Sequence, residues 1–268
     1  MGLAVETVVG YLDAAAVTTR QVFTPSGAQS FTVRAASATS KAHLRSVWSD
    51  LSGTGQLDIR SPRLHDAIEA VNLRAPATDQ RPLVAPWFDQ PLIPVDVLDV
   101  GVTFDAAPVA ATVEGVAMLI QYDDLPGATL NARNWSEVQP VIKSIYGVEV
   151  TPATGATAGT WGPGVAINST QDQFKANELY AVLGYLVSGG CIAVGIQGAD
   201  TSNYLVGGPG STDALVTRSY FVDLANASGL PLIPVIQANN KQSTLVTVAG
   251  LVAATNVSVS LILANLAS

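Results

Sequence analysis

The residues best suited to chemistry are few: two histidines, His43 and His65, and one cysteine, Cys191. The histidines form neither a His-x-His nor a His-x-x-x-His pair, the spacings that gather imidazole ligands around a metal ion. No Gly-x-Ser-x-Gly turn accompanies them, and the His65-Asp66 pair is typical of a loop hydrogen bond rather than of a hydrolase. Cys191 lies in an apolar run, which predicts a buried, unreactive thiol, and a lone cysteine excludes an intrachain disulfide. We therefore expect no catalytic residue, no metal ligand and no cofactor site.

Two pairs of carboxylates could contribute to a calcium site, namely Asp96 with Asp99 and Asp123 with Asp124. Neither pair has the spacing of an EF-hand loop, so we interpret them as solvated or interface carboxylates and leave ion binding at Asp123 and Asp124 open. The glycine-rich run at 207–210 does not lead into the Gly-Lys-Ser/Thr sequence of a phosphate-binding loop, and it predicts a turn.

Four tryptophans could stack against sugar rings. One lies on a predicted strand and three lie near loops, an arrangement that favours packing in a core or an interface over a binding platform. They are Trp48, Trp87, Trp135 and Trp161.

The composition indicates a protein with covered surfaces. Charged residues make up 13% of the chain and apolar residues 48%, and the charged share is about half the usual one. Such a surface suits a protein that is buried against other subunits. The net charge of −8 and the lack of a basic run argue against nucleic-acid binding through phosphate neutralisation. The uncharged tail at 244–268 has period-two segments, so it predicts two strands rather than a membrane-spanning helix.

A five-residue sequence occurs twice, as Pro-Leu-Ile-Pro-Val at 91–95 and again at 231–235. Apolar residues upstream and downstream of each copy also match in the same order, with small slips between blocks. The repeat is much longer than the 20–50 residues of solenoid proteins. The sequence therefore predicts an internal duplication in which each copy is a complete small domain.

Short apolar runs, many with period two and separated by Gly and Pro turn signals, predict an all-β chain. About eight strands in each copy is the number found in a jelly roll. The predicted strands are 30–34, 43–51, 56–60, 68–74, 95–104, 112–122, 179–187, 191–196, 215–224, 232–237, 245–252 and 257–263. Of these, 43–51 and 179–187 could instead be short helices.

Two segments favour helices. In 4–17 the apolar residues lie on one helical stripe, and 136–146 begins with Ser136 as an N-cap. We therefore expect two tandem jelly-roll β-sandwiches with a short helical N-terminal arm and a partly helical connector. The predicted boundaries are an arm at 1–29, a first jelly roll at 30–130, a connector with a short helix at 131–165 and a second jelly roll at 166–268.

The chain resembles the double jelly-roll major capsid proteins of the tectivirus, corticovirus and adenovirus-hexon lineage. The resemblance rests on the two Pro-Leu-Ile-Pro-Val blocks and on the strand and turn at 117–127, which ends in Asp-Asp-Leu-Pro-Gly. The strand at 56–66, which ends in Ser-Pro-Arg-Leu-His-Asp, is similar to this lineage too. The resemblance covers residues 30–268, as an overall architecture.

The resemblance implies a structural protein of the virion, assembled in the host cytoplasm, and no enzyme. Its expected partners are two further copies in a trimeric, pseudo-hexameric capsomer of an icosahedral shell, neighbouring capsomers and other capsid proteins. An internal membrane under the shell could be a further partner. The resemblance implies an N-terminal arm that points inward toward neighbours or such a membrane, and 2–17, with no Lys or Arg before Arg20, fits contact with protein better than with anionic lipid. No sequence-specific nucleic-acid binding is expected. Two alternatives remain: a carbohydrate-binding or adhesion module, and an enzyme of the bicupin type.

Overall fold

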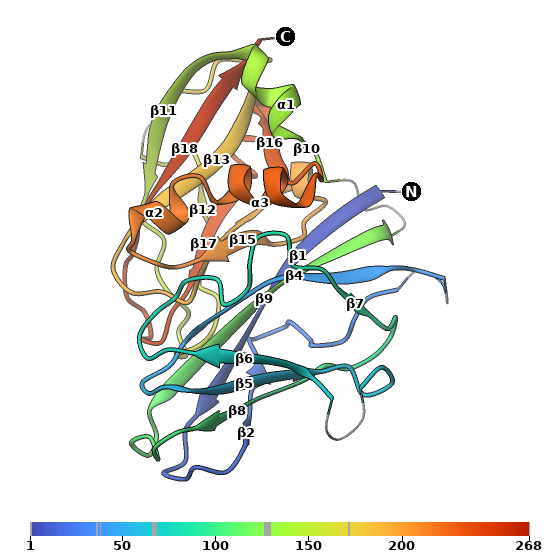
Figure 1. The fold of residues 1–268 in the computed structure, drawn as a ribbon. Helices are drawn as coiled ribbons and strands as arrows, with labels where there is room; N and C mark the ends of the chain where they lie inside the picture. The colour runs from blue at the N-terminus through green and yellow to red at the C-terminus, as the bar shows by residue number, and fades with distance from the viewer. Residues whose placement is uncertain are drawn as a thin grey trace.

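The computed structural model describes residues 2–35, 37, 39–65, 69–125, 130–170 and 172–267. The chain is an all-β sandwich fold whose strands form four antiparallel sheets, with few helices (Figure 1). We call residues 2–125 the first half and residues 130–267 the second half. Figure 1 shows the first half below and the second half above, with the two in contact.

The first half contains nine strands. They are β1 (Gly2–Asp13), β2 (Gln21–Val22), β3 (Thr24–Pro25), β4 (Ala42–Asp50), β5 (Gly55–Arg60), β6 (Val71–Ala75), β7 (Gln90–Leu92), β8 (Asp99–Phe104) and β9 (Val113–Leu125).

The second half contains nine strands and the helices. The strands are β10 (Ala132–Arg133), β11 (Ile142–Val150), β12 (Val165–Ala166), β13 (Leu179–Ser188), β14 (Ala193–Gln197), β15 (Val206–Pro209), β16 (Ile233–Gln237), β17 (Leu245–Ala249) and β18 (Ser258–Leu266). The helices are α1 (Trp135–Val138), α2 (Ala214–Thr217) and α3 (Tyr220–Ser228), with 3-10 turns η1 (Gln139–Val141), η2 (Ala199–Thr201) and η3 (Ala238–Asn240).

The two halves have the same strand order. The sheets of the first half run β3-β1-β9-β4-β7 and β2-β8-β5-β6, and those of the second run β10-β16-β13-β18-β11 and β12-β17-β14-β15. Without the two-residue strands β3 and β10, each half has eight strands, and β1, β9, β4 and β7 correspond in order to β11, β18, β13 and β16. Eight strands in two sheets is the composition of a jelly roll. This repeated order is what an internal duplication requires.

An irregularity in the strand pairing marks the same place in both halves. The register between β4 and β9 shifts between Leu44 and Ser46, and that between β13 and β18 shifts between Val182 and Gly184. Bulges are retained features of a fold, so they fix which residues correspond. Leu44 corresponds to Val182, and by the same pairing Pro91 on β7 corresponds to Val235 on β16. The repeated pentapeptide therefore lies at corresponding strands, β7 and β16. Its own alignment matches Pro91 with Pro231, four residues away from the match that the strand pairing gives.

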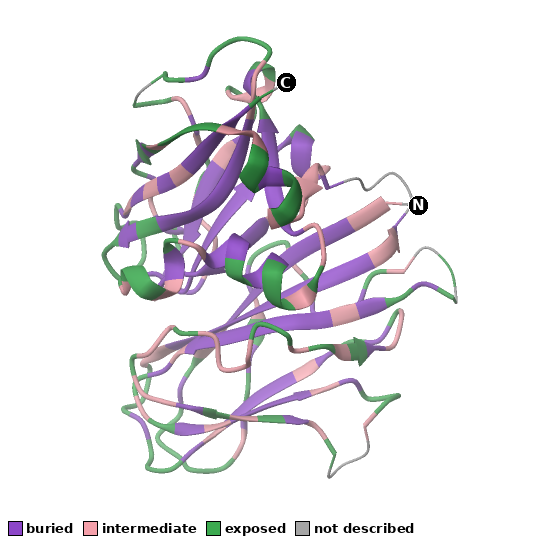
Figure 2. Cartoon of the chain, turned by 45° about the horizontal axis from the view of Figure 1, so that its top comes forward, coloured by how far each residue is buried: buried purple, intermediate pink, exposed green. Residues whose placement is uncertain are grey.

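The core of the first half lies between its two sheets, with Leu44 and Met118 from one sheet and Leu57 and Val102 from the other. The core of the second half extends across the boundary between the halves. It includes five residues of the first half, which are Val5, Val9, Trp48, Ala117 and Leu119. The sheet that contains β1, β4 and β9 is therefore buried on both faces, as the purple central strands of Figure 2 show.

The prediction of a helix at 4–17 is wrong, because residues 2–13 form the strand β1. Ala4 and Val8 face the core of the first half, while Val5 and Val9 face the second half. A strand buried on both faces has a nearly continuous apolar sequence, which imitated a helical stripe here. Since β1 pairs with β9 along its length, it belongs to the sheet and is not an arm that points toward a neighbour or a membrane.

The strand predicted at 215–224 is also wrong, since this segment contains α2 and most of α3. Asp213 caps α2 by accepting a hydrogen bond from the backbone N–H of Leu215 at 2.9 Å, and Gly229 ends α3 with a φ of 69°. The predicted helix at 136–146 is shorter than expected, because β11 begins at Ile142. The ambiguous segments at 43–51 and 179–187 are strands.

These elements suggest different boundaries from the predicted ones. Because β1 and β2 lie in the sheets of the first half and β11 and β12 in those of the second, we propose units at 2–125 and 142–266. They would replace the predicted arm at 1–29 and connector at 131–165. Among the described residues, no helix is long and apolar enough to cross a membrane.

Candidate functional site

We call the sheet that contains β1, β4 and β9 the central sheet. His43 lies in a polar cluster at one end of it. Its Nδ1 lies 2.7 Å from a carboxylate oxygen of Asp89, and its Nε2 lies 3.4 Å from one of Asp123. Arg45 contacts the same Asp89 at 3.1 Å and donates a hydrogen bond to Gln121 at 2.8 Å. These contacts tie β4, β9 and the segment before β7 together. A serine or cysteine nucleophile is not among the described partners of this cluster.

His65 lies in a turn, where its Nδ1 accepts a hydrogen bond from the backbone N–H of Ser61 at 2.9 Å. Its sequence neighbour Asp66, with which we predicted a pair, lies outside the described residues. The two histidines belong to separate sets of contacts. The prediction of a pair between His65 and Asp66 therefore stays a prediction.

The carboxylates of Asp96 and Asp99 do not meet at one site. Asp96 is buried and accepts hydrogen bonds from Ser61 and from the backbone of Arg63. Burial opposes its ionisation, but these hydrogen bonds and the Arg63 charge outweigh it and hold the pKa of Asp96 below its usual value. Asp99 instead contacts Arg20 at 3.0 Å.

Asp123 and Asp124 also have separate surroundings. Asp123 contacts His43, whereas one carboxylate oxygen of Asp124 is buried and accepts no hydrogen bond from the described residues. The turn predicted at 126–127 lies outside the described part of the chain. Within the described residues, no three or more His, Cys, Asp or Glu side chains gather as metal ligands.

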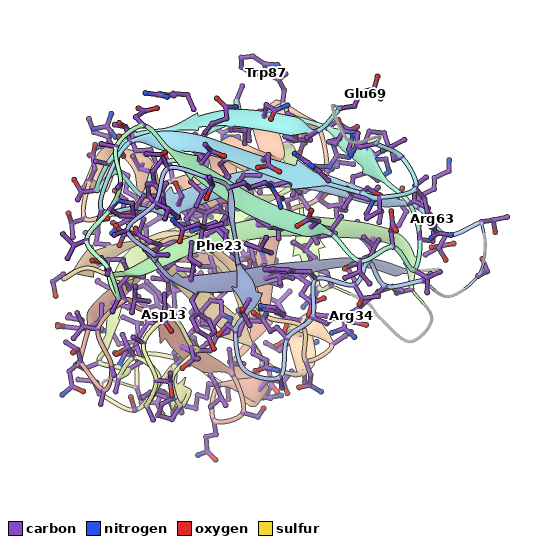
Figure 3. All side chains as sticks on the ribbon, turned by 90° about the horizontal axis from the view of Figure 1, so that it is seen from below. Asp13, Phe23, Arg34, Arg63, Glu69 and Trp87 are labelled. Atoms are coloured by element: carbon purple, nitrogen blue, oxygen red, sulfur yellow. The ribbon has the colours of Figure 1, made fainter. Side chains whose placement is uncertain are left out.

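The four tryptophans do not form a platform. Trp48 is fully buried at the boundary between the halves, and Trp135 packs against the core of the second half. Trp161 lines a cleft described below, and Trp87 projects into solvent with 71% of its surface exposed (Figure 3). Trp48 and Trp135 therefore contribute to packing and Trp161 lines a cleft, and the four rings lie in separate places.

Cys191 is fully buried, and the glycine-rich run that contains Gly210 lies beside it. Burial raises the pKa of the Cys191 thiol to about 12. Because only the thiolate reacts, we expect Cys191 in the folded protein to resist a thiol reagent at about pH 8 and to react when urea unfolds the chain. Absorbance with a chromogenic disulfide reagent measures this. Equal rates with and without urea would contradict it.

Glu114, which is fully buried, and Asp50, which is half-buried, lie near each other where the end of β4 pairs with the start of β9. Burial raises the pKa of Glu114, whose carboxylate accepts a hydrogen bond from the backbone N–H of Ser52 at 2.6 Å, and burial raises the pKa of Asp50 as well. The charge of Asp50 also helps to raise the pKa of Glu114. Both groups therefore bind protons more readily in the folded chain than in the unfolded one.

The substitution Glu114→Gln tests this coupling. Because the pKa of Glu114 is higher in the folded chain than in the unfolded one, the charged carboxylate destabilises the folded protein at pH values above the folded pKa. This destabilisation disappears as the pH falls toward the pKa of a glutamate in an unfolded chain, about 4.3. We expect Glu114→Gln to be more stable than the wild type at neutral pH and to lose this advantage as the pH approaches that value. The advantage should be about 1.4 kcal/mol for every tenfold difference in proton affinity between the folded and unfolded chains. Urea unfolding at several pH values measures it. An advantage independent of pH would show that Glu114 does not titrate in this range.

The contact between the halves is the most extensive functional candidate in the molecule. The Trp48 indole donates a hydrogen bond to the backbone oxygen of Ile192 at 2.7 Å, and its ring meets that of Tyr220 edge-on at 6.4 Å. On β1, the backbone N–H of Thr7 donates to the oxygen of Leu205 at 2.7 Å. The Thr7 hydroxyl accepts from the N–H of Gly207 at 2.9 Å. The edge of β1 thus meets β15 through main-chain and side-chain hydrogen bonds.

Gln29 closes the rest of this edge. Its amide nitrogen donates to the oxygen of Thr7 at 2.7 Å, and its amide oxygen accepts from the N–H of Val9 at 3.0 Å. The same oxygen accepts from the Trp161 indole at 2.8 Å. The exposed main chain of an edge strand is a template for unwanted pairing, and in β1 the chain's own groups cover it.

A cleft of about 510 Å³ lies between the halves. On one wall, the Arg34 guanidinium donates to both carboxylate oxygens of Glu6, at 2.8 and 2.9 Å. The same guanidinium lies over the ring of Tyr204, 5.4 Å from its centre. Trp161 and Gln197 also line the cleft. Aromatic faces beside amide and charged groups can contact a polar ligand through stacking and hydrogen bonds.

No family model matches the chain, and no curated protein matches it. Among solved structures, the chain is similar to a chain of the atomic structure of Sulfolobus Turreted Icosahedral Virus. The two are 8% identical, the match covers 99% of this chain and 91% of that chain, and the TM-score is 0.21. A likeness at this TM-score is too weak to assign a fold or a function.

Proposed function

We propose that this chain is a structural protein of a viral capsid, built from two tandem jelly rolls. The observation that carries the proposal is the repeated order of eight strands, with the same irregularity in the pairing of β4 with β9 and of β13 with β18. Two similar units in one chain allow three copies to present six units around one axis. The low share of charged residues, 13%, suits surfaces that neighbouring copies cover.

The proposed assembly is a homotrimer that forms pseudo-hexameric capsomers of an icosahedral shell in the virion. Contacts between unlike faces of identical copies form a ring when the rotation closes, and three copies make the smallest such ring with six jelly rolls. Neighbouring capsomers and other capsid proteins would be the further partners. We propose a non-enzymatic role, because the polar clusters described above carry structural hydrogen bonds.

Light scattering of the purified chain, combined with negative-stain images, tests the proposal. We expect a species with three times the chain mass of 27.6 kDa and a pseudo-hexagonal outline. A species that remains at 27.6 kDa at every concentration would overturn the trimeric assembly.

The cleft between the halves favours a second candidate, the binding of a carbohydrate. Trp161 and Tyr204 offer aromatic faces, and the Glu6–Arg34 pair and Gln197 offer hydrogen-bonding groups at the same opening. Methyl glycosides of glucose, galactose and N-acetylglucosamine are suitable probes, with NMR saturation transfer as the measurement. We expect transfer to the glycoside in the wild type and its loss in Trp161→Ala. No transfer at millimolar glycoside would overturn this candidate.

A further inference from the structure

The boundary between the halves covers one face of the central sheet in the first half. Five side chains of this face are at most 2% exposed, and they are Val5, Val9, Trp48, Ala117 and Leu119. They pack into the core of the second half. The first half therefore has a built partner for this face within the same chain.

The strand pairing shows which residues form the corresponding face of the second half. Trp48 pairs with Ala117 two positions after the irregularity in β4, and Leu186 pairs with Ser260 two positions after that in β13. Val9 pairs with Ala117 in β1, and Glu149 pairs with Ser260 in β11. The same correspondence continues along both strands. We define the open face as Ile145, Gly147, Glu149, Leu186, Ser260 and Ile262.

The open face is accessible to a partner. Ile145 is 55% exposed and Leu186 is 40% exposed, whereas their counterparts Val5 and Trp48 are 2% and 0% exposed. Gly147 and Glu149 are exposed, and Ser260 and Ile262 are half-buried. Three of the six positions, Ile145, Leu186 and Ile262, thus carry apolar side chains, whereas Glu149 and Ser260 are polar.

The edge of the open face is accessible as well. In β1, Thr7 bonds to Leu205 and Gly207, but Gly147, the counterpart of Thr7, has no such partner among the described residues. Figure 1 shows β11 at the outer edge of its sheet. β11 is nine residues long, and an edge of this length is normally shortened, charged or covered.

The first half carries the counterpart of one part of the covering surface, the strand β15, but no described helix stands in the place of α3 with its Tyr220. In the second half, β15 covers the edge of β1, and its Val206 pairs with Ile196 on β14. In the first half, the first pair that β6 makes with β5 is Val71 with Ile59, as Val206 with Ile196 is the first pair of β15. We align the two halves on these first pairs, which places Asn72 at the position of Gly207. β6 is an edge strand, and Asn72 and Arg74 are exposed.

We propose that the open face of one copy is covered by the β6 side of a second copy, in the arrangement that the two halves adopt within the chain. The internal contact supplies the template, since β15 already covers the edge of β1 in this way. The contact joins unlike faces, so successive copies follow one another around a ring. This inference deepens the proposed capsid function, because it names the surfaces through which the copies meet.

Lysine substitutions on the open face provide the first test. Leu186→Lys and Ser260→Lys place a charge at the centre of the face, and Val252→Lys, at a side chain that is 64% exposed in the same half, is the matched control. We expect each variant of the open face to weaken assembly at least tenfold in light scattering, while Val252→Lys assembles as the wild type does. Circular dichroism checks that all three fold.

Cysteine pairing tests the register. Gly147→Cys and Asn72→Cys replace the counterparts of Thr7 and Gly207, and the added Cβ at 147 would closely approach only the flexible Ser260 side chain, at 3.0 Å. The native Cys191 is buried. We expect a mixture of the two single variants to form a disulfide-linked dimer under mild oxidation, and the double variant to form a closed covalent oligomer. Neither single variant alone should form the link.

The outcomes separate this inference from the proposed function. If the wild type forms a trimer that the lysine variants leave intact, the named contact is wrong and the capsid proposal stands. If the lysine variants dissociate an assembly that is not a trimer, the named contact stands and the trimeric capsomer is wrong. A monomeric wild type without cross-linking in the cysteine mixture overturns both.

Discussion

The substitution Trp48→Ala is expected to lower the free energy of unfolding by about 3–5 kcal/mol, the usual cost of removing a large buried aromatic ring. Trp48 is fully buried, contacts Tyr220 edge-on and donates a hydrogen bond to the oxygen of Ile192. Alanine removes the ring from the boundary between the halves and leaves a cavity that the two sheets can fill only by moving together. Urea unfolding followed by circular dichroism measures the loss.

Trp87→Ala is the matched control for this prediction. Trp87 is 71% exposed, so its replacement should change the free energy of unfolding by no more than about 0.5 kcal/mol. Equal effects of the two substitutions would show that Trp48 does not hold the halves together.

The substitution Gly207→Ala is expected to be strongly destabilising. A Cβ at this position would lie 2.1 Å from the backbone oxygen of Val194 and 3.0 Å from the Cα of Gly195. Both belong to β14, which pairs with β15, so neither atom can rotate away. Displacing the strand would also move the N–H that donates to Thr7. We expect a loss of about 3 kcal/mol or more, at or beyond the upper end for overpacked sites.

Gly190→Ala separates a specific clash from a general intolerance of alanine. A Cβ at Gly190 has no neighbour within 4 Å, and its φ is not in the left-handed region. This variant should therefore unfold within about 0.5 kcal/mol of the wild type. If thermal unfolding shows that Gly207→Ala and Gly190→Ala have equal stability, the close approach of β15 to β14 is not rigid.

The sequence predicted β4, β9 and most other long strands from apolar runs that end at turn signals. It failed at β1 and in the segment at 215–224. β1 is buried on both faces, so its apolar residues form no period-two pattern, and the segment at 215–224 has the apolar density of a strand but begins at a helix cap, Asp213.

The contact between the halves was harder to predict than the strands. Trp48 had a signal, since a large aromatic residue on a strand must pack somewhere, but its partner Ile192 is distant in sequence. Thr7 and Gly207 carried no signal, because their bond depends on two strand edges that meet only in the folded chain. The repeated pentapeptide indicated that two copies exist without giving their register.

The position of β1 has a consequence for synthesis of the protein. Gly2 pairs with Leu125 and Asp13 with Val113, so β1 leaves the ribosome well before its partner β9, the last strand of the first half. The face of β1 that packs against the second half stays exposed to solvent until the residues around Ile192 and Gly207 have been synthesised. Chains with such distant pairings fold slowly and expose apolar surface while they do so. A nascent chain of this protein should therefore associate with chaperones until the second half is nearly complete.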